Sequence, residues 1–277
     1  MDRLTLPFLE TMITQVCNLS CQGCTNYSDL KHSGYVSWEQ GRTWLEPWTE
    51  LLDIPDFGIM GGEPLINPEV VQWIVGVREL LPNTQIRFTT NGLLLHKCPD
   101  LLKVLQDIGN CVFKISVHLE DETLEDIIQR IFAQYSWQEV TEYGIRRWKT
   151  DRGLRFQVNR PSQFLKTFYG EYSVMRPHQS KPSNAFDLCV QKTCPLLYKD
   201  RIYKCSTSAL LLDTLERFDK PNWSQWEPYI EQGITVDSPH KEIQAFVDNF
   251  GRLHQRCGQC PDSRSQPLMH FATVTRK

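Results

Sequence analysis

The first 160 residues alternate between short apolar runs and longer stretches in which apolar residues recur at helical spacing. Residues 8–16, 57–60, 86–90, 111–119 and 154–158 predict strands. The stretches between them predict helices over residues 37–52, 68–81, 99–108 and 120–135. Ser37 is a suitable N-cap for the first of these helices, and Pro47 should kink it. Strands that alternate with helices pair in parallel through right-handed crossovers, so the pattern predicts a full or partial β/α barrel.

The pattern changes after about residue 160. Residues 176–184 hold two prolines and two serines and predict a linker. Residues 196–198 and 201–203 predict a short hairpin, although its turn, Lys199-Asp200, lacks the glycine that such loops favour. Ser238-Pro239 then predicts the start of a helix that runs to Cys257. We therefore expect an α/β unit over residues 1–175 and a small, cysteine-rich α+β extension over residues 176–277.

Composition and charge exclude several kinds of partner. The chain has 277 residues, a net charge of −3 and a pI near 6.2, so no basic field attracts nucleic acid or an anionic membrane. The short basic cluster at 146–149 is interpreted as a solvated helix face. No window approaches the roughly 20 apolar residues of a membrane span, and no signal peptide is recognisable. The expected location is the cytoplasm.

Cysteine is over-represented, with ten residues. In a chain of this size without an export signal, closely spaced cysteines favour metal ligation over disulfides. Cys98 and Cys111 stand alone and are expected to be small buried hydrophobic residues. The other eight form two groups.

The first group, Cys17, Cys21 and Cys24, has the spacing C-x3-C-x2-C at the end of the first predicted strand. Three thiolates can hold three corners of a [4Fe–4S] cluster and leave the fourth iron open to an external ligand. The alternative is a zinc site, for which His32 is the local candidate for a fourth ligand. The spacing alone leaves both interpretations open.

The N-terminal unit resembles the radical S-adenosylmethionine (radical SAM) superfamily. The resemblance rests on the three-cysteine loop after the first strand and on Gly61, Gly62, Glu63 and Pro64 after the second. It implies a partial (β/α)6 barrel in which the open iron binds the amino and carboxylate groups of S-adenosylmethionine. It also implies that the glycines let backbone carbonyls approach the bound ammonium group, with Glu63 as a charged acceptor.

Two weaker matches and one departure accompany this resemblance. Asn91, after the third strand, and Ser116, late in the fourth, match positions that lie near the cofactor in many relatives, although a turn-forming residue and a strand hydroxyl would fit as well. Many relatives place an aromatic residue before the third cysteine, against the adenine, whereas this chain has Gly23. The adenine contacts must then come from elsewhere, for which Tyr27 is a candidate.

The second cysteine group lies in the extension. Cys257 and Cys260 form a C-x2-C knuckle, and the remaining members precede or follow the predicted hairpin: Cys189, Cys194 and Cys205. Spacing alone favours structural zinc. The segment resembles, however, the twitch and SPASM extensions of radical SAM enzymes, which implies an auxiliary [4Fe–4S] cluster. Five cysteines compete for four positions, and either Cys189 or Cys194 is expected to be the one left out.

The resemblance implies an enzyme that cleaves S-adenosylmethionine to a 5′-deoxyadenosyl radical and abstracts a hydrogen atom from a small molecule such as a sugar or aminocyclitol. The alternatives are a peptide-modifying maturase and a non-catalytic metal-binding module. The implied partners are the substrate and a low-potential electron donor of the flavodoxin or ferredoxin type. No residue of the chain is assigned as a catalytic acid or base.

Overall fold

The computed structural model describes residues 3–119, 121–142, 144–161, 164–262, 268–269 and 274–277. A large sheet lies at its centre, formed by β2 (Leu9–Met12), β5 (Asp56–Met60), β6 (Gln85–Thr90), β7 (Cys111–Ser116), β8 (Gln138–Glu142), β9 (Ile145–Lys149), β10 (Arg155–Asn159), β12 (Leu196–Tyr198) and β13 (Arg201–Tyr203). The order of these nine strands is β13-β12-β2-β5-β6-β7-β10-β9-β8. The strands from β12 to β10 run parallel, and β13, β9 and β8 are antiparallel to their neighbours. The predicted mixed α/β class is confirmed.

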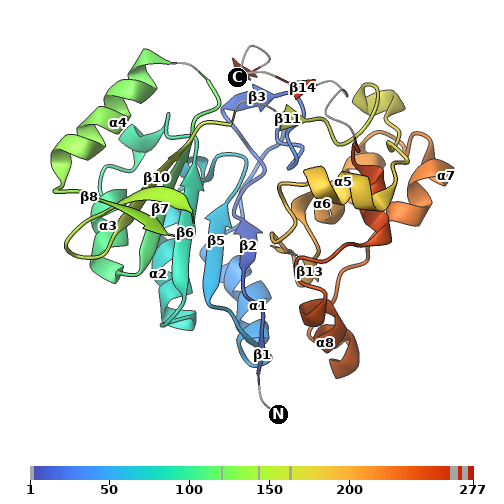
Figure 1. Ribbon diagram of the computed structural model, residues 1–277, viewed down its shortest axis with the longest axis horizontal. Helices are drawn as coiled ribbons and strands as arrows, with labels where there is room; N and C mark the ends of the chain where they lie inside the picture. Colours follow the sequence, from blue (N-terminus) through green and yellow to red (C-terminus); the bar gives the residue numbers. More distant parts are fainter. Residues whose placement is uncertain (1–2, 120, 143, 162–163, 263–267, 270–273) are drawn as a thin grey trace.

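Helices follow the early strands and cover one face of the sheet (Figure 1). They are α1 (Trp38–Thr49), α2 (Val70–Leu80), α3 (Leu101–Ile108) and α4 (Glu122–Gln134), with short 3₁₀ turns η1 (Pro64–Ile66) and η2 (Leu95–Lys97). The Ser37 side chain accepts a hydrogen bond from the Gln40 N–H and caps α1, as predicted. Residue 120, the first position expected in the fourth helix, lies outside the described residues.

The two faces of the sheet differ in chemistry. Phe57, Phe88, Phe113 and Phe156 belong to the core shared with the helices, and the last three stack in sequence across neighbouring strands. The strand registers place polar residues on the opposite face, where Glu10, Gly58 and Arg87 lie side by side. Lys114 and Ser116 of β7 share this face because side chains alternate along a strand. A polar face thus leads up to the carboxyl ends of the strands.

The predicted hairpin is confirmed, and it extends the main sheet. Strand β12 pairs in parallel with β2, so that Leu196 lies opposite Glu10 and Leu197 opposite Thr11. Lys199 takes a φ of +58° at the turn, a conformation that such turns usually reserve for glycine. The hairpin is therefore built onto the edge of the N-terminal unit.

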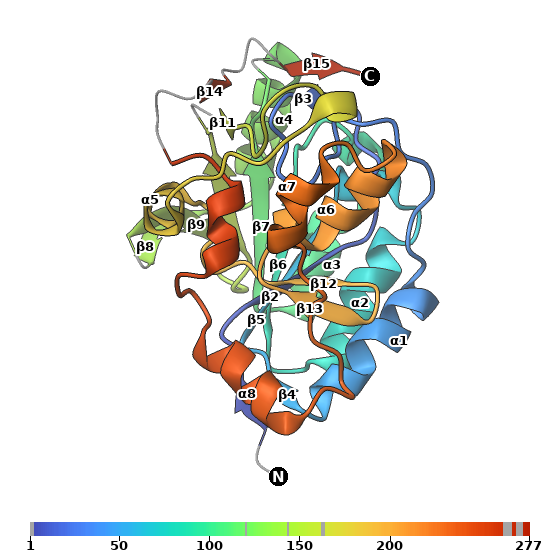
Figure 2. The ribbon, with the colours of Figure 1, turned by 90° about the vertical axis from the view of Figure 1, so that its right-hand side faces the viewer.

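The rest of the extension is helical and packs beside this hairpin (Figure 2). It comprises η3 (Tyr172–Val174), α5 (Pro182–Leu188), α6 (Ser206–Arg217), α7 (Trp223–Trp226), η4 (Glu227–Tyr229), α8 (His240–Asp248) and η5 (Gln255–Gln259). A second core holds α6 and α7 against β2 and β12, through residues such as Leu210, Trp226, Met12 and Leu196. Helix α6 was not predicted.

Three two-stranded ladders complete the description. Strand β1 (Leu4–Thr5) pairs with β4 (Leu52–Asp53), and β11 (Phe164–Leu165) pairs with β14 (Leu268–Met269). Strand β3 (Leu19–Cys21), inside the first cysteine group, pairs with β15 (Val274–Arg276). Sequences more than 250 residues apart therefore meet at this loop.

Two expectations from the sequence were wrong. The basic cluster at 146–149 lies on strand β9, and Arg147 is only 3% exposed because it forms an ion pair with Glu142. The expected linker at 176–184 is interrupted by α5, which starts with a proline at its first turn. The ion pair of Arg147 and the first-turn proline of α5 thus outweighed local composition in these two segments.

Candidate functional site

Cys17, Cys21 and Cys24 lie on one compact loop directly after β2. The N–H of Cys24 donates to the carbonyl of Cys21 at 3.0 Å, and Gly23 has a φ of +80°, which closes the turn between them. The N–H of Leu19 donates to Cys17 Sγ at 3.4 Å. The loop thus presents three thiols from a short stretch of backbone.

These three cysteines line a cavity of about 150 Å³ at the carboxyl ends of β2, β5, β6 and β7. The sequence-predicted residues that share its wall are Gly61, Gly62, Asn91 and Ser116. Residues from four separate strand ends therefore meet at the edge where parallel α/β folds place their active residues.

Gly61 and Gly62 are required by close packing of backbones. A Cβ atom at Gly61 would lie 2.7 Å from the carbonyl oxygen of Thr14, and one at Gly62 would lie 2.5 Å from that of Val16. The N–H of Gly62 donates to the Thr14 carbonyl at 2.8 Å. The loop after β5 is therefore held against the segment that leads into the cysteine loop.

Glu63 and Pro64 do not line the cavity, which departs from the expectation for Glu63. Its carboxylate is fully buried and accepts hydrogen bonds from Thr90 Oγ1 at 2.6 Å, the Leu65 N–H at 3.0 Å and the Asn91 N–H at 2.7 Å. Burial raises the pKa of Glu63 to about 7, against the lowering effect of these donors. The side chain ties two loops together, while Pro64 opens η1 behind the wall.

Asn91 links the third strand to the cysteine loop. Its Nδ2 donates to Asn18 Oδ1 at 2.7 Å and lies 4.0 Å from Cys17 Sγ, and its Oδ1 accepts from the Leu93 N–H at 3.1 Å. The side chain is thereby fixed against the first cysteine.

Sequence reasoning missed two titratable residues of the cavity wall, His118 and Asp29. His118 follows Ser116 by two positions, so the period of the strand could have indicated it. Burial, with a smaller effect of Lys114, lowers the pKa of His118 to about 4. Asp29 Oδ1 accepts a 2.6 Å hydrogen bond from the Tyr172 hydroxyl, and burial raises its pKa. No local pattern marks Asp29, because its partner comes from the extension.

Tyr27, the candidate for an adenine contact, packs away from this cavity. It is 1% exposed and belongs to the second core, next to Phe168 and Tyr172. The structure thus assigns Tyr27 to the packing of the extension.

The chemistry of the three thiols suits an iron–sulfur cluster. Burial raises the pKa of Cys17 to about 12 and also raises the pKa values of Cys21 and Cys24 above that of an ordinary thiol. Buried thiols become thiolates when a metal supplies the compensating positive charge. A single zinc ion would need its thiolates within about 4 Å of one another. Across the described part of the chain, no three Cys, His, Asp or Glu side chains are grouped to hold one ion.

Four cysteines of the second group line a separate cavity in the extension. Cys189 lies at the end of α5, Cys205 at the start of α6, and Cys257 and Cys260 in or beside η5. Burial raises the pKa values of Cys205, to about 12, and of Cys260. The N-terminus of α6 favours a thiolate at Cys205. Cys194 does not line this cavity, and it lies near Glu10 and Lys114. Burial raises its pKa to about 12, with a smaller raising effect of Glu10.

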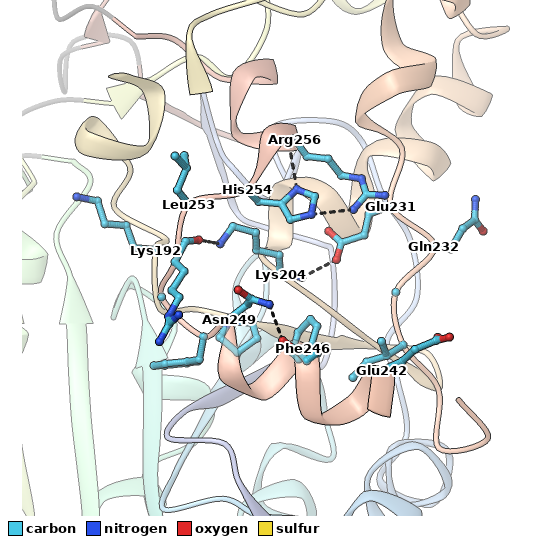
Figure 3. A pocket seen from close by; sticks show the side chains of 17 residues that line it. Lys192, Lys204, Glu231, Gln232, Glu242, Phe246, Asn249, Leu253, His254 and Arg256 are labelled. Carbon is cyan, nitrogen blue, oxygen red and sulfur yellow. Dashed lines mark hydrogen bonds between the residues drawn. The ribbon is translucent and has the colours of Figure 1, made fainter. Parts of the chain in front are cut away.

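A larger cavity of about 330 Å³ adjoins the four-cysteine cavity (Figure 3). Phe246 and Phe250 of α8 and its following turn form part of its apolar wall, and Glu231 lies on the opposite side. Lys204 and Arg256 line both cavities. No cysteine lines the larger one, so thiolates cannot hold a cluster there.

Of the two isolated cysteines, Cys111 is buried as predicted and Cys98 is only partly buried. Cys111 is fully buried in the core of the N-terminal unit, and Cys98 packs partly buried against that core. Neither lines the cavities described above. Within the described residues, no helix combines the length and apolar character that crossing a membrane requires.

Two curated proteins, both GTP 3′,8-cyclases, are similar to part of this chain. GTP 3′,8-cyclase of Rippkaea orientalis is 29% identical over 140 residues, which cover 49% of this chain and 41% of the cyclase. GTP 3′,8-cyclase of Petrotoga mobilis is 35% identical over 102 residues, which cover 36% of this chain and 31% of the cyclase. The matches thus span less than half the length of these curated relatives.

A solved structure is similar over nearly the whole chain. The crystal structure of BtrN in complex with AdoMet and 2-DOIA matches with a TM-score of 0.53 and 14% identity, over 96% of each chain. At that identity the likeness shows the fold alone. The radical SAM superfamily model, in turn, matches residues 11–146, which include the three-cysteine loop and the glycines after β5. The chain therefore contains a radical SAM superfamily domain, at residues 11–146.

Proposed function

We propose that the chain is a radical SAM enzyme in which Cys17, Cys21 and Cys24 hold a [4Fe–4S] cluster with one iron left for S-adenosylmethionine. The observation that carries the proposal is the single cavity shared by these cysteines and by Gly61 and Gly62. When bound, the cluster and S-adenosylmethionine supply a 5′-deoxyadenosyl radical that abstracts a hydrogen atom from the substrate. The protein itself binds and orients S-adenosylmethionine and the substrate and excludes water from them.

Each cavity residue has a role that follows from its contacts. The backbone carbonyls near Gly61 and Gly62 can accept hydrogen bonds from the ammonium group of S-adenosylmethionine. Asn91 holds the cysteine loop through Asn18. Ser116, 8% exposed at the end of β7, offers a hydroxyl at the same wall. Glu63 contributes indirectly, because its carboxylate accepts a hydrogen bond from the Asn91 N–H and so fixes the position of Asn91.

We assign a second, auxiliary [4Fe–4S] cluster to Cys189, Cys205, Cys257 and Cys260, and leave Cys194 out of the ligand set. The shared cavity supports this set, as does the resemblance of the segment to twitch extensions. A cluster held by these four cysteines would supply an electron acceptor, and the net reaction we propose is an oxidation. A low-potential flavodoxin or ferredoxin would supply the electron for S-adenosylmethionine cleavage.

The proposed substrate is a small polar molecule of the sugar or aminocyclitol type. Polar side chains of the sheet face below the cofactor cavity support this class, namely Glu10, Arg87 and Lys114. They offer both a hydrogen-bond acceptor and donors, which suit hydroxyl and amino groups. An apolar substrate would offer no hydrogen-bond partner to Glu10 or Lys114.

Anaerobic reconstitution with iron and sulfide tests the two cluster assignments. We expect about eight iron atoms per chain, four for each cluster. Addition of S-adenosylmethionine should change the EPR spectrum of the reduced cluster at Cys17, Cys21 and Cys24 only. A spectrum that does not respond, in protein with its full iron content, would argue for a metal-binding module without radical chemistry.

A further inference from the structure

The segment 274–277 pairs with the cysteine loop itself. In the ladder between β15 and β3, Val274 lies opposite Cys21 and Arg276 opposite Leu19. Both ribbon views show this end of the chain beside β3, at the carboxyl ends of the central strands (Figures 1 and 2). Residues 19–21, inside the loop that carries the three cysteines, therefore form one strand of a two-stranded ribbon.

Side chains fasten this ribbon on both sides. Val274 is 5% exposed and packs with Leu19 and Cys21 in a small apolar cluster, which Cys17 and Cys24 also contact. Arg276 forms an ion pair with Asp121, the residue that caps α4. The segment thus covers the cysteine loop and connects it to a helix of the N-terminal unit.

Lys277 ties two further parts of the loop together. Its N–H donates to the Asn18 carbonyl at 2.9 Å, and its Nζ donates to the carbonyls of Ser28 at 2.6 Å and Leu30 at 2.8 Å. The Lys277 backbone thus contacts the loop between its first and second cysteines, and the Lys277 side chain contacts the segment after the third. Its ammonium group is thereby held at backbone carbonyls of the segment that directly follows Cys24.

We propose that residues 274–277 act as a strap that positions the cluster-binding loop, and that the Lys277 ammonium raises the reduction potential of the cluster held there. The proposal rests on the proposed assignment of this cluster to Cys17, Cys21 and Cys24. Reduction adds a negative charge, which a nearby cation favours. Val274 covers Cys21 and limits access of water and chelators to this side of the loop.

The test compares Lys277→Met, Lys277→Arg and Lys277→Ala with a matched control, Lys241→Met, whose exposed lysine lies on α8. The reduction potential of the S-adenosylmethionine-responsive cluster is followed by EPR during a redox titration. Release of its iron to a ferrous chelator is followed by absorbance. Neither measurement depends on turnover of a substrate.

We expect Lys277→Met to lower the potential and to release iron roughly tenfold faster, because two hydrogen bonds and a charge are lost. Lys277→Arg should restore the potential, and Lys277→Ala should behave like Lys277→Met. The control should match wild type. An unchanged potential and an unchanged release rate in Lys277→Met would overturn the strap. A wild-type protein without an S-adenosylmethionine-responsive cluster would instead remove the proposed function.

Discussion

The carboxylate of Glu63 accepts a hydrogen bond from the backbone N–H of Asn91 across 2.7 Å. This bond joins the loop after β5 to the loop after β6, and the side chain of Asn91 then extends the connection to Asn18. Three strand ends are thereby fixed relative to one another through one buried carboxylate. The arrangement explains why a charged residue is tolerated in a fully buried position.

Replacement of Glu63 by Gln tests this structural role. The amide would present an N–H₂ group to one of three backbone or hydroxyl donors, so that a buried donor loses its acceptor. We expect the free energy of unfolding to fall by about 1–3 kcal/mol in urea titrations. The exposed Glu46→Gln should leave the midpoint unchanged. A Glu63→Gln protein of wild-type stability that fails to bind S-adenosylmethionine would instead place Glu63 in direct contact with the cofactor.

Single replacements of Cys189 and Cys194 by Ala should separate the two cysteines that the sequence could not. Cys189 lines the four-cysteine cavity, whereas Cys194 lies near Glu10. We expect Cys189→Ala to lose about four iron atoms per chain and Cys194→Ala to retain the full content after reconstitution. The reverse pattern would exchange their roles.

Much of the N-terminal unit could be predicted because its strands and helices differ in period. The hairpin at 196–203 was found for the same reason. Helix α6 was not, because its first turn, Ser206 to Ser208, is polar yet buried against Gln191 and the cysteine cavity. A polar segment of this kind is interpretable only after its long-range partners are known.

Part of the candidate site could likewise be predicted from the sequence, and part could not. Cysteines and glycines could be identified because their spacing is local. The pairing of β15 with the cysteine loop involves Val274 and Cys21, which are far apart in the sequence, and no local pattern encodes it. The motif predicts the position of Glu63 but not the direction of its side chain, which accepts hydrogen bonds from Thr90 and Asn91.

A reciprocal packing of two tryptophans on two glycines joins α1 to α2. The Trp73 ring lies where a Cβ of Gly41 would be, and the Trp38 ring lies where a Cβ of Gly76 would be. The two rings meet edge to face with their centroids 5.2 Å apart. This close approach of the two helices depends on the absence of a side chain at both glycines.

We therefore expect Gly41→Ala to destabilise the protein, although helix propensity alone predicts stabilisation. Propensity alone would stabilise a helix by about 1 kcal/mol. The methyl group would overlap the Trp73 ring, and we expect a net destabilisation of about 1–3 kcal/mol in denaturant unfolding. Gln40→Ala, exposed on the same helix, should be neutral or slightly stabilising. A more stable Gly41→Ala protein would show that the helices separate without cost.

Glu10 should make stability depend on pH. Burial raises its pKa to about 8, although Lys114 and Arg87 act in the opposite direction. The folded state therefore binds this proton more tightly than the unfolded state, whose carboxyl has an ordinary pKa near 4.5. The stabilisation is complete below about pH 4.5 and is lost as the pH rises to about 8.

Urea midpoints between pH 5 and pH 8 check this dependence. Wild-type stability should fall more steeply over the range than that of Glu10→Gln, whose side chain does not titrate. Glu46→Gln, which is exposed, should retain the wild-type slope. Parallel curves for wild type and Glu10→Gln would mean that Glu10 is ionised in the folded protein throughout.

The proposed chemistry is tested most directly by chromatography of a reduced reaction. Reconstituted protein is incubated anaerobically with S-adenosylmethionine and dithionite, beside a variant in which Cys17, Cys21 and Cys24 are Ala and the auxiliary cysteines are intact. We expect 5′-deoxyadenosine and methionine from the wild type in equal amounts and neither from the variant. Absence of 5′-deoxyadenosine from wild-type protein with its full iron content would contradict the account.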